Sequence, residues 1–192
     1  MKKKLSDRTL EELWLLFPVI LRPYNPEWPQ WYADEAAELK TLFASEIERM
    51  RHIGSTSVPG LTAKPTVDIL LEISADAEIP SIKERLLSNE WIIFSETATP
   101  DFRLDCGKGY TENGFAERVF HLHIRHSGDW DEPYFCEYLR LHSDAAEEYV
   151  QLKMALAVKF VHDRNAYTEE KTDFIKRKTA AARTEFPGKF RA

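Results

Sequence analysis

The feature that most constrains this chain is an apolar, β-branched run over residues 67–73, which is typical of a buried strand. Asp68 and Glu72 interrupt the run and lie on one face of the expected strand. A carboxylate on a buried strand loses hydration, which is costly unless a partner compensates. Asp68 is therefore expected to meet a metal ion, a cation or strong hydrogen-bond donors. A role as an ordinary structural acceptor is the alternative.

A loop rich in small hydroxyl residues precedes that strand. Residues 47–53 predict an earlier strand, and the loop then begins with Gly54, Ser55, Thr56 and Ser57. Small side chains beside a glycine let backbone N–H groups and hydroxyls approach an anion closely. Lys64 adds a positive charge nearby. The segment predicts a phosphate-binding loop, with an ordinary turn as the alternative.

Hydrophobic spacing and turn residues divide the rest of the chain. A first helix, capped by Ser6 or Asp7 and ended by Pro18, is expected to bury Leu10, Leu13, Trp14 and Phe17. Further helices are expected over 28–44, 80–87 and 132–141, from a cap at Ser143 through Phe160, and over 167–182. Further strands are expected over 19–21, 91–94, 102–106 and 118–125, with a glycine-rich connection at 107–114. The charged residues of the last helices are expected to be solvated.

This order of elements predicts a mixed fold. Helices come first, strands and helices alternate in the centre, and the last third is helical, which indicates an α+β or α/β domain. We expect an N-terminal helical extension over residues 1–17, a single domain over 18–185 and a tail over 186–192.

Charge and apolar content narrow the class of partner. The 192 residues carry 26 Lys and Arg against 32 Asp and Glu, a net charge of -6. A broad nucleic-acid surface normally needs a basic face, so only a local phosphate site is expected. No run approaches the roughly 20 apolar residues of a membrane helix, and no signal-peptide core is present. With Cys106 and Cys136 expected to be reduced thiols, a cytoplasmic protein is predicted. The sequence gives no signal of oligomeric state.

Two histidines provide a second candidate group. His121 and His123 alternate with apolar residues, so both side chains are expected on one face of their strand. If that strand pairs near Asp68, the two imidazoles and the carboxylate form a metal or acid–base cluster. Polar residues on the exposed face of a half-buried sheet are the alternative. Further candidate anion ligands, each with a solvated charge or a structural contact as its alternative, are His52, Arg103, Lys108 and Arg118.

The sequence around these residues resembles the signature of the GrpB family, which is placed in the nucleotidyltransferase (polymerase β-like) superfamily. The resemblance rests on His-Ile-Gly-Ser-Thr-Ser-Val-Pro-Gly-Leu at 52–61, Ala-Lys-Pro at 63–65 and Asp-Ile at 68–69. It extends to Arg-Pro-Tyr-Asn-Pro-Glu-Trp at 22–28, Phe-His-Leu-His-Ile at 120–124 and Tyr-Leu-Arg-Leu-His at 138–142. It covers roughly residues 18–180 and also includes Tyr149, Lys153 and Lys171 in the last helices.

The resemblance implies a minimal nucleotidyltransferase fold, an α+β mixed sheet flanked by helices with a helical C-terminal third. The superfamily pattern is a hydrophobic residue followed by Gly and Gly or Ser, then a spacer, then Asp, a hydrophobic residue and a second carboxylate. Ile53, Gly54 and Ser55 fit its first part, and the twelve residues before Asp68 fit its spacer. Leu70 stands where the second carboxylate belongs. Glu72 does not replace it, because it is about 13 Å from Asp68 along the strand.

The resemblance implies a metal-dependent nucleotidyltransferase acting on a nucleotide or another phosphorylated small molecule, with Asp68, His121 and His123 as catalytic and metal-binding residues. Mg²⁺ is the expected ion, and other divalent ions remain open. The expected phosphate and nucleotide ligands are His52, Gly54, Ser55, Thr56, Ser57, Lys64, Arg103, Arg118 and Arg140. One alternative is a non-catalytic phosphate-binding or regulatory module, which also suits the fusion of some GrpB-like domains to dephospho-CoA kinase. The other is a metal-dependent hydrolase that uses the His/Asp cluster.

Overall fold

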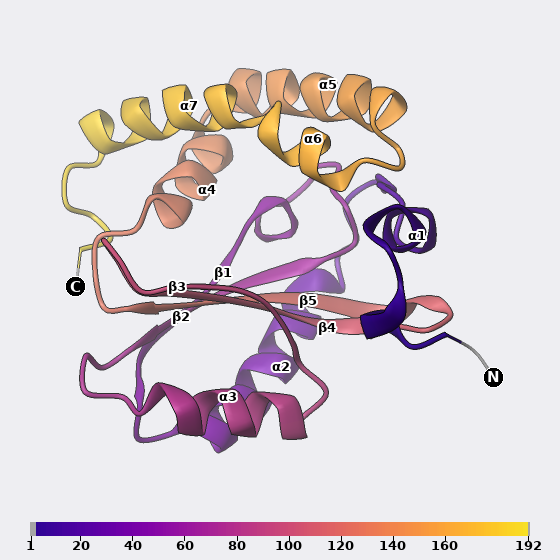
Figure 1. Ribbon diagram of the computed structural model, residues 1–192. Helices are drawn as coiled ribbons and strands as arrows, with labels where there is room; N and C mark the ends of the chain where they lie inside the picture. Colours follow the sequence, from indigo (N-terminus) through magenta and orange to yellow (C-terminus); the bar gives the residue numbers. More distant parts are fainter. Residues whose placement is uncertain (1–2, 192) are drawn as a thin grey trace.

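The computed structural model describes residues 3–191, and a mixed five-stranded sheet lies at the centre of this part of the chain (Figure 1). The first two residues of the expected N-terminal extension and the last residue of the expected tail lie outside the described residues. The strand order is β1-β2-β5-β4-β3, and β2 and β5 are parallel while the other neighbours are antiparallel. The strands are β1 (Ile47–Ile53), β2 (Val67–Ile73), β3 (Ile92–Thr97), β4 (Arg103–Thr111) and β5 (Gly114–His126).

Helices lie on both faces of this sheet. Figure 1 shows α2 (Trp28–Phe43) and α3 (Ile79–Ser88) below the sheet and a helical layer above it. That layer consists of α4 (Asp131–Leu141), α5 (Ser143–Lys159), α6 (Arg164–Glu169) and α7 (Thr172–Glu185). The short α1 (Leu10–Leu16) lies beside the end of the β4–β5 hairpin. The expected mixed α+β fold is confirmed. None of the described helices combines the length and apolar character that crossing a bilayer requires.

The face toward α2 and α3 holds the main hydrophobic core. Alternate residues of the two central strands point to it, because successive side chains of a strand point to opposite faces. They pack against Trp28 and Phe43 of α2 and Leu86 of α3, and all are almost completely buried. Full burial of each such side chain contributes about 1.5–3 kcal/mol. The strand residues of this face are Val67, Ile69, Leu71, Ile73, Phe120, Leu122 and Ile124.

The opposite face of the sheet is polar and lies under the helical layer. Glu72 is fully buried there, where Arg49 donates to both of its carboxylate oxygens at 2.5 Å and the backbone N–H of Gly128 donates at 3.2 Å. Arg125 of β5 donates to Asp105 of β4 at 2.7 Å. Paired charges of this kind are tolerated in a low-dielectric interior because each retains strong hydrogen bonds.

Most expected elements are present, and the expected strands at 91–94, 102–106 and 118–125 are longer in the structure. Residues 107–114, predicted as a connection, instead continue β4 to a tight turn between Thr111 and Gly114, where β5 begins. The prediction was wrong because the ladder of hydrogen bonds continues past the glycines. Residues 19–21 do not form a strand. Val19 donates instead to the carbonyl of Val161, and Arg22 forms an isolated bridge with Ala63.

Helix ends also differ from the prediction. Thr9, rather than Ser6 or Asp7, caps α1, because its hydroxyl and the Glu12 carboxylate form a reciprocal capping box. Ser143 is the first residue of α5 and not its cap. The expected helix over 167–182 is two helices, α6 and α7, which meet at residues 170–171. This break brings Lys171 to the start of α7.

Gly54 allows the loop after β1 to pass close to Asp68. Its φ of 70° and ψ of -176° belong to a region that only glycine adopts readily. A Cβ at this position would lie 2.2 Å from Oδ2 of Asp68, which is far inside van der Waals contact. Two separate constraints therefore require a glycine between β1 and the 3₁₀ turn over Ser55–Ser57.

Replacement of this glycine tests both constraints. We expect Gly54→Ala to lower the free energy of unfolding by more than the matched variant Gly60→Ala. Gly60 has a similar φ of 79° but no atom within 4 Å of a new Cβ. Gly60→Ala carries only backbone strain, about 1–2 kcal/mol, whereas Gly54→Ala must also displace the Asp68 carboxylate. Urea unfolding of both variants measures the difference, and equal losses would show that the contact with Asp68 imposes no constraint.

Candidate metal and anion site

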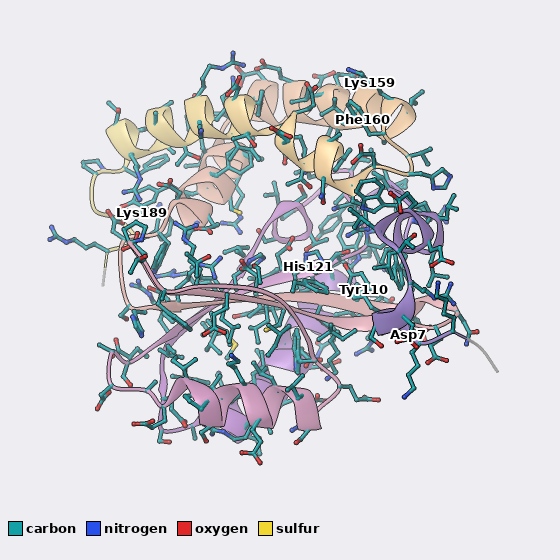
Figure 2. The ribbon with its side chains drawn as sticks, viewed as in Figure 1. Asp7, Tyr110, His121, Lys159, Phe160 and Lys189 are labelled. Atoms are coloured by element: carbon teal, nitrogen blue, oxygen red, sulfur yellow. The ribbon has the colours of Figure 1, made fainter. Side chains whose placement is uncertain are left out.

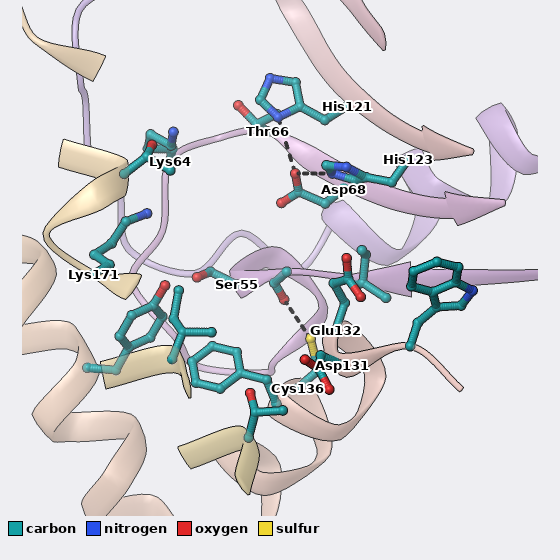
Figure 3. A pocket seen from close by; sticks show the side chains of 18 of the residues that line it. Ser55, Lys64, Thr66, Asp68, His121, His123, Asp131, Glu132, Cys136 and Lys171 are labelled. Carbon is teal, nitrogen blue, oxygen red and sulfur yellow. Dashed lines mark hydrogen bonds and ion pairs between the residues drawn. The ribbon is translucent and has the colours of Figure 1, made fainter. Parts of the chain in front are cut away.

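The parallel pairing of β2 with β5 brings a carboxylate beside two imidazoles. Asp68 lies opposite His121 in the register, and His123 lies one row further along β5. Asp68 Oδ1 is 3.3 Å from His121 Nδ1 and 3.5 Å from His123 Nε2, and all three candidate ligand atoms lie within 4.8 Å of one another (Figure 3). Ligands bound at about 2.1 Å to one ion are themselves roughly 3.0–3.5 Å apart. The spacing of Asp68 to each imidazole therefore suits one divalent ion.

Each imidazole has an oxygen partner on its other nitrogen. His123 Nδ1 donates to Asp105 Oδ1 at 2.8 Å, and Arg125 donates to the same oxygen. His121 Nε2 lies 2.6 Å from the hydroxyl of Tyr110. Figure 2 labels both residues at the sheet. Histidines that bind metals commonly hold such a partner, which fixes the ring orientation and directs the remaining nitrogen at the ion.

The charges within this cluster are strongly coupled. Burial would raise the pKa of Asp68, but its contacts with His121 and His123 outweigh burial and hold that pKa well below its usual range. Burial lowers the pKa of His121 despite the neighbouring Asp68. For His123 burial acts in the same direction, yet the hydrogen bonds to Asp105 and Asp68 prevail and raise its pKa to about 9. The carboxylate is thus held ionised between the two rings.

A cavity of about 810 Å³ lies between this cluster and the helical layer. Three lysines and an arginine line one side of it, and we call this group the lysine end: Lys64, Lys153, Arg164 and Lys171. Figure 3 shows Lys64 and Lys171 beside Ser55 at this side of the cavity. No carboxylate within the described chain forms an ion pair with Lys64, Lys153 or Lys171 at 4 Å or less. The lysine end is therefore a cluster of basic side chains whose three lysines have no carboxylate partner within ion-pair distance.

The lysines of this group are held by neutral atoms. Lys153 is almost fully buried and donates to Ser55 Oγ at 3.1 Å and to the carbonyl oxygen of Thr62. Lys171 lies over the ring of Tyr167, with its Nζ 4.3 Å from the ring centroid. Burial, and next the charge of Lys171, lower the pKa of Lys153 to about 7. Burial lowers the pKa of Lys171 to about 8 although Asp68 opposes this. Burial and nearby cations lower the pKa of Lys64 well below its usual range.

Only part of the loop over residues 54–57 lines the cavity, and the rest stabilises the fold. Gly54 and Ser55 line the cavity together with Lys64. Thr56 is instead buried, where its hydroxyl donates to the Thr66 carbonyl. Ser57 donates to the carbonyl of Gly54 at 2.8 Å. These two hydroxyls stabilise the turn rather than line the cavity.

The other expected phosphate ligands differ in whether they line the cavity. Arg103 lines the cavity with its guanidinium over the Trp130 ring. His52 does not line it, because its ring stacks on Tyr32 and its Nε2 contacts Thr56; burial lowers its pKa to about 4. The remaining three candidates are held by structural contacts: Arg118 by Asp34, Arg140 by Ser57 and Glu137, and Lys108 by Glu35 and Glu38.

Sequence reasoning missed several residues that build this site. The charged residues of the last helices were expected to be solvated, yet only 2% of Lys153 and 9% of Lys171 is exposed. Lys153 follows Tyr149 by four residues, so it shares the buried face of that aromatic residue. This spacing could have indicated a buried lysine. Asp105, Tyr110 and Arg164 had no signal, because their roles depend on strand register and on how α6 packs.

The sequence is similar to those of known proteins. A sequence model of the family described as GrpB protein matches residues 18–181. The chain is 31% identical, over 80% of its length, to UPF0157 protein YqkA of Bacillus subtilis (strain 168), and 34% identical, over 81%, to UPF0157 protein PA4798 of Pseudomonas aeruginosa. It spans 44% and 64% of the lengths of these two curated relatives.

The fold is likewise similar to a solved structure. The crystal structure of conserved protein GrpB from Enterococcus faecalis superposes with a TM-score of 0.72 at 28% identity, covering 87% of this chain and 99% of that chain. The family match includes β1 through most of α7, and therefore the Asp68 cluster and the lysine end. By sequence and by fold, the chain belongs to the GrpB family.

Proposed function

We propose that this protein is a metal-dependent nucleotidyltransferase that acts on a nucleotide or a closely related phosphorylated small molecule. The observation that carries the proposal is the meeting of two groups in one cavity: the Asp68, His121 and His123 cluster and the lysine end. A polyphosphate is the ligand class that needs both a divalent ion and several unpaired cations. The volume of about 810 Å³ falls within the range of small-molecule sites.

The donor set bears on the choice of ion. One carboxylate and two imidazoles fit Mn²⁺, Fe²⁺ or Zn²⁺ better than Mg²⁺, which prefers oxygen ligands. We therefore replace the expected Mg²⁺ with an ion that accepts imidazole, and Mn²⁺ is our first choice because it also tolerates phosphate oxygens. Asp68, His121 and His123 would hold it. When bound, such an ion polarises a phosphoryl oxygen and offsets charge in the transition state.

The chain's own residues supply the remaining tasks. Ser55, held by Lys153, presents its hydroxyl to a phosphate at the edge of the cavity. The lysine end stabilises the negative charge of the departing pyrophosphate. In the proposed step an acceptor oxygen bonds to the α-phosphorus, and the bond from that phosphorus to the bridging oxygen breaks. Pyrophosphate leaves with the electron pair, and the hydroxyl proton passes to solvent.

One observation favours a second candidate, a phosphate-binding module without catalysis. Leu70, where the superfamily has a second carboxylate, is fully buried and packs in a cluster with Phe135, Cys136 and Leu139 of α4. A carboxylate there would need a partner that this apolar cluster does not offer. The position cannot contribute a ligand for a second ion. Two-metal chemistry is therefore not proposed.

Metal and nucleotide titrations test the proposal. We expect Mn²⁺ to bind the wild-type chain and nucleoside triphosphates to raise the unfolding temperature only when Mn²⁺ is present, since a ligand that binds the folded state stabilises it. Asp68→Asn, which retains the shape of the side chain, should abolish metal binding. Asp105→Asn should weaken it about 10–100-fold, because Asp105 orients His123. Calorimetry measures the metal and thermal unfolding the nucleotide.

The outcomes separate the candidates. Release of pyrophosphate from a nucleoside triphosphate with an added acceptor, lost in Asp68→Asn, would support nucleotidyl transfer. Nucleotide binding that depends on Ser55 but ignores both the metal and Asp68→Asn would overturn it in favour of the binding module. Release of phosphate to water without any acceptor would favour a hydrolase.

The buried lysines predict a pH dependence. The pKa is about 7 for Lys153 and about 8 for Lys171, so both amines are increasingly neutral above those values. Binding of a polyphosphate at higher pH therefore requires the uptake of protons by these lysines. We expect the affinity for tripolyphosphate to fall at least tenfold between pH 7 and pH 9, since each proton taken up costs about tenfold per pH unit. In Lys153→Arg the guanidinium stays charged, so the fall should be shallower.

The stability of the free protein should show the opposite trend. The folded-state pKa of each lysine is lowered from 10.5, so the unfolded chain binds more protons between pH 7 and about 10. The cost of these buried charges is present in full below pH 7 and is relieved as the pH rises through 7 to 10.

The affinity prediction has its own contrary outcome. An affinity for tripolyphosphate that stays constant from pH 7 to pH 9 would show that Lys153 and Lys171 do not contact the polyphosphate.

A further inference from the structure

Ser55 and Lys153 form a pair whose proton chemistry the proposed function leaves unused. Lys153 Nζ on α5 lies 3.1 Å from Ser55 Oγ in the loop after β1, although the two residues are 98 positions apart in the chain. The same Nζ donates to the carbonyl oxygen of Thr62. Ser55 lines the cavity, and Figure 3 shows its side chain and that of Asp68 around the same space. A carbonyl, an amine and a hydroxyl are thus linked in one row that ends at the cavity.

The surroundings of Lys153 favour a neutral amine. Only 2% of the residue is exposed, and its Nζ lies 4.6 Å from the centroid of the Tyr149 ring. None of the ion pairs among residues 3–191 includes Lys153, and the charged groups that act on it are the cations Lys64 and Lys171. Burial, and next the charge of Lys171, lower its pKa to about 7. Tyr149 stays neutral, because burial raises its pKa. An amine that is partly neutral near pH 7 is available as a base.

A serine hydroxyl beside such a base matches the geometry of an activated nucleophile. In that geometry the hydroxyl and the base lie within hydrogen-bond reach, and a third group orients the base. A serine with a lysine is one variant of this arrangement. When Lys153 is neutral, its lone pair can accept the Ser55 proton while one of its N–H groups donates to the Thr62 carbonyl. A lysine that only supported the fold would be expected to pair with a carboxylate, since lysines are almost never fully buried unless paired.

We propose that Ser55 is a nucleophile with Lys153 as its base, and that Ser55 holds the nucleotidyl group before passing it to the acceptor. This inference rests on the proposed function, in which the nucleotide enters the same cavity. Ser55 Oγ bonds to the α-phosphorus, its proton goes to Lys153, and pyrophosphate leaves with the electron pair of the bridging P–O bond. In the second step the acceptor oxygen bonds to that phosphorus and loses its proton to solvent, while Ser55 Oγ leaves and recovers the proton from Lys153.

Proton transfer and positive charge are compatible at Lys153. The amine begins neutral, so it takes up the Ser55 proton at the moment when negative charge develops on the leaving pyrophosphate. The ammonium group that results stabilises this charge together with Lys64 and Lys171. The proton that the polyphosphate requires at the lysine end therefore comes from the nucleophile instead of from solvent.

A fluorophosphonate probe tests the nucleophile without a nucleotide or a metal ion. Ser55 Oγ would bond to the phosphorus of an alkyl fluorophosphonate, the P–F bond would break, fluoride would leave and Lys153 would take the proton. We expect the full chain to be labelled at Ser55, as mapped by peptide mass spectrometry. The rate should rise about tenfold from pH 6 to pH 8, because the neutral fraction of an amine with a pKa of about 7 rises by that factor.

Two substitutions separate the base from the charge. Lys153→Arg keeps a positive charge but cannot accept a proton, so labelling should slow about 100-fold and lose its rise with pH. The same variant should still bind tripolyphosphate, which shows that it is folded. Ser55→Ala should not be labelled. The matched controls are Lys178→Arg, at a lysine paired with Glu148, and Ser81→Ala, at an exposed serine of α3, and both should be labelled like the wild-type chain.

Nucleotide chemistry tests the covalent step. With Mn²⁺ and a nucleoside triphosphate but no acceptor, we expect a burst of about one equivalent of pyrophosphate per chain, since accumulation of a covalent intermediate gives such a burst. Peptide mass spectrometry should then find a nucleoside monophosphate ester on Ser55. Lys153→Arg should lose the burst and still be stabilised by the nucleotide against thermal unfolding.

The inference and the proposed function fail separately. A wild-type chain that binds Mn²⁺ and the nucleotide but is labelled by neither reagent at Ser55 would overturn the nucleophile and favour direct transfer to the acceptor. Labelling that keeps its full rate in Lys153→Arg would overturn Lys153 as the base. Probe labelling of Ser55 in a wild-type chain that binds no nucleotide would overturn the proposed function and support the nucleophile.

Discussion

The carboxylate of Asp68 is the constraint on which the site depends. It lies on β2, an inner strand of the sheet, where an isolated charge would cost several kcal/mol even after the protein relaxes. The parallel neighbour β5 compensates with His121 and His123, and those rings are oriented in turn by Tyr110 and Asp105. Gly54 is fixed by the same carboxylate, because no Cβ fits beside it. One charge on β2 thus determines residues on two other strands, β4 and β5, and in one loop.

The two faces of the sheet divide stability from function. The face toward α2 and α3 is apolar and supplies the hydrophobic burial that holds the fold. The other face carries charged groups under a helical layer that contributes Lys153, Arg164 and Lys171. Placing like charges together without counterions destabilises the free protein. In the proposed function a phosphorylated ligand would relieve that repulsion, and this cost in stability would be the source of its affinity.

Much of this fold could be predicted from the sequence, because the central strands show clear local patterns. The run over 67–73 and the alternation around His121 and His123 indicated buried strands and the face that the histidines share. Pairings between distant segments had no such signal. Arg118 was grouped with the anion ligands by residue type and Arg140 by the motif in which it lies, yet they contact Asp34 and Ser57. Local periodicity predicts which face a side chain occupies, and only the register of the sheet decides its neighbours.

Leu70 and the histidines together favour chemistry with a single ion. In the superfamily pattern two carboxylates on one strand allow two ions to be shared, which suits oxygen-loving Mg²⁺. Here α4 packs against Leu70, and the additional donors come from the neighbouring strand as imidazoles. Imidazole shifts the preference toward Mn²⁺, Fe²⁺ or Zn²⁺. In the proposed reaction, with one ion instead of two, the charge of the departing phosphates would be stabilised by protein cations. The unpaired lysines of the helical layer would supply them.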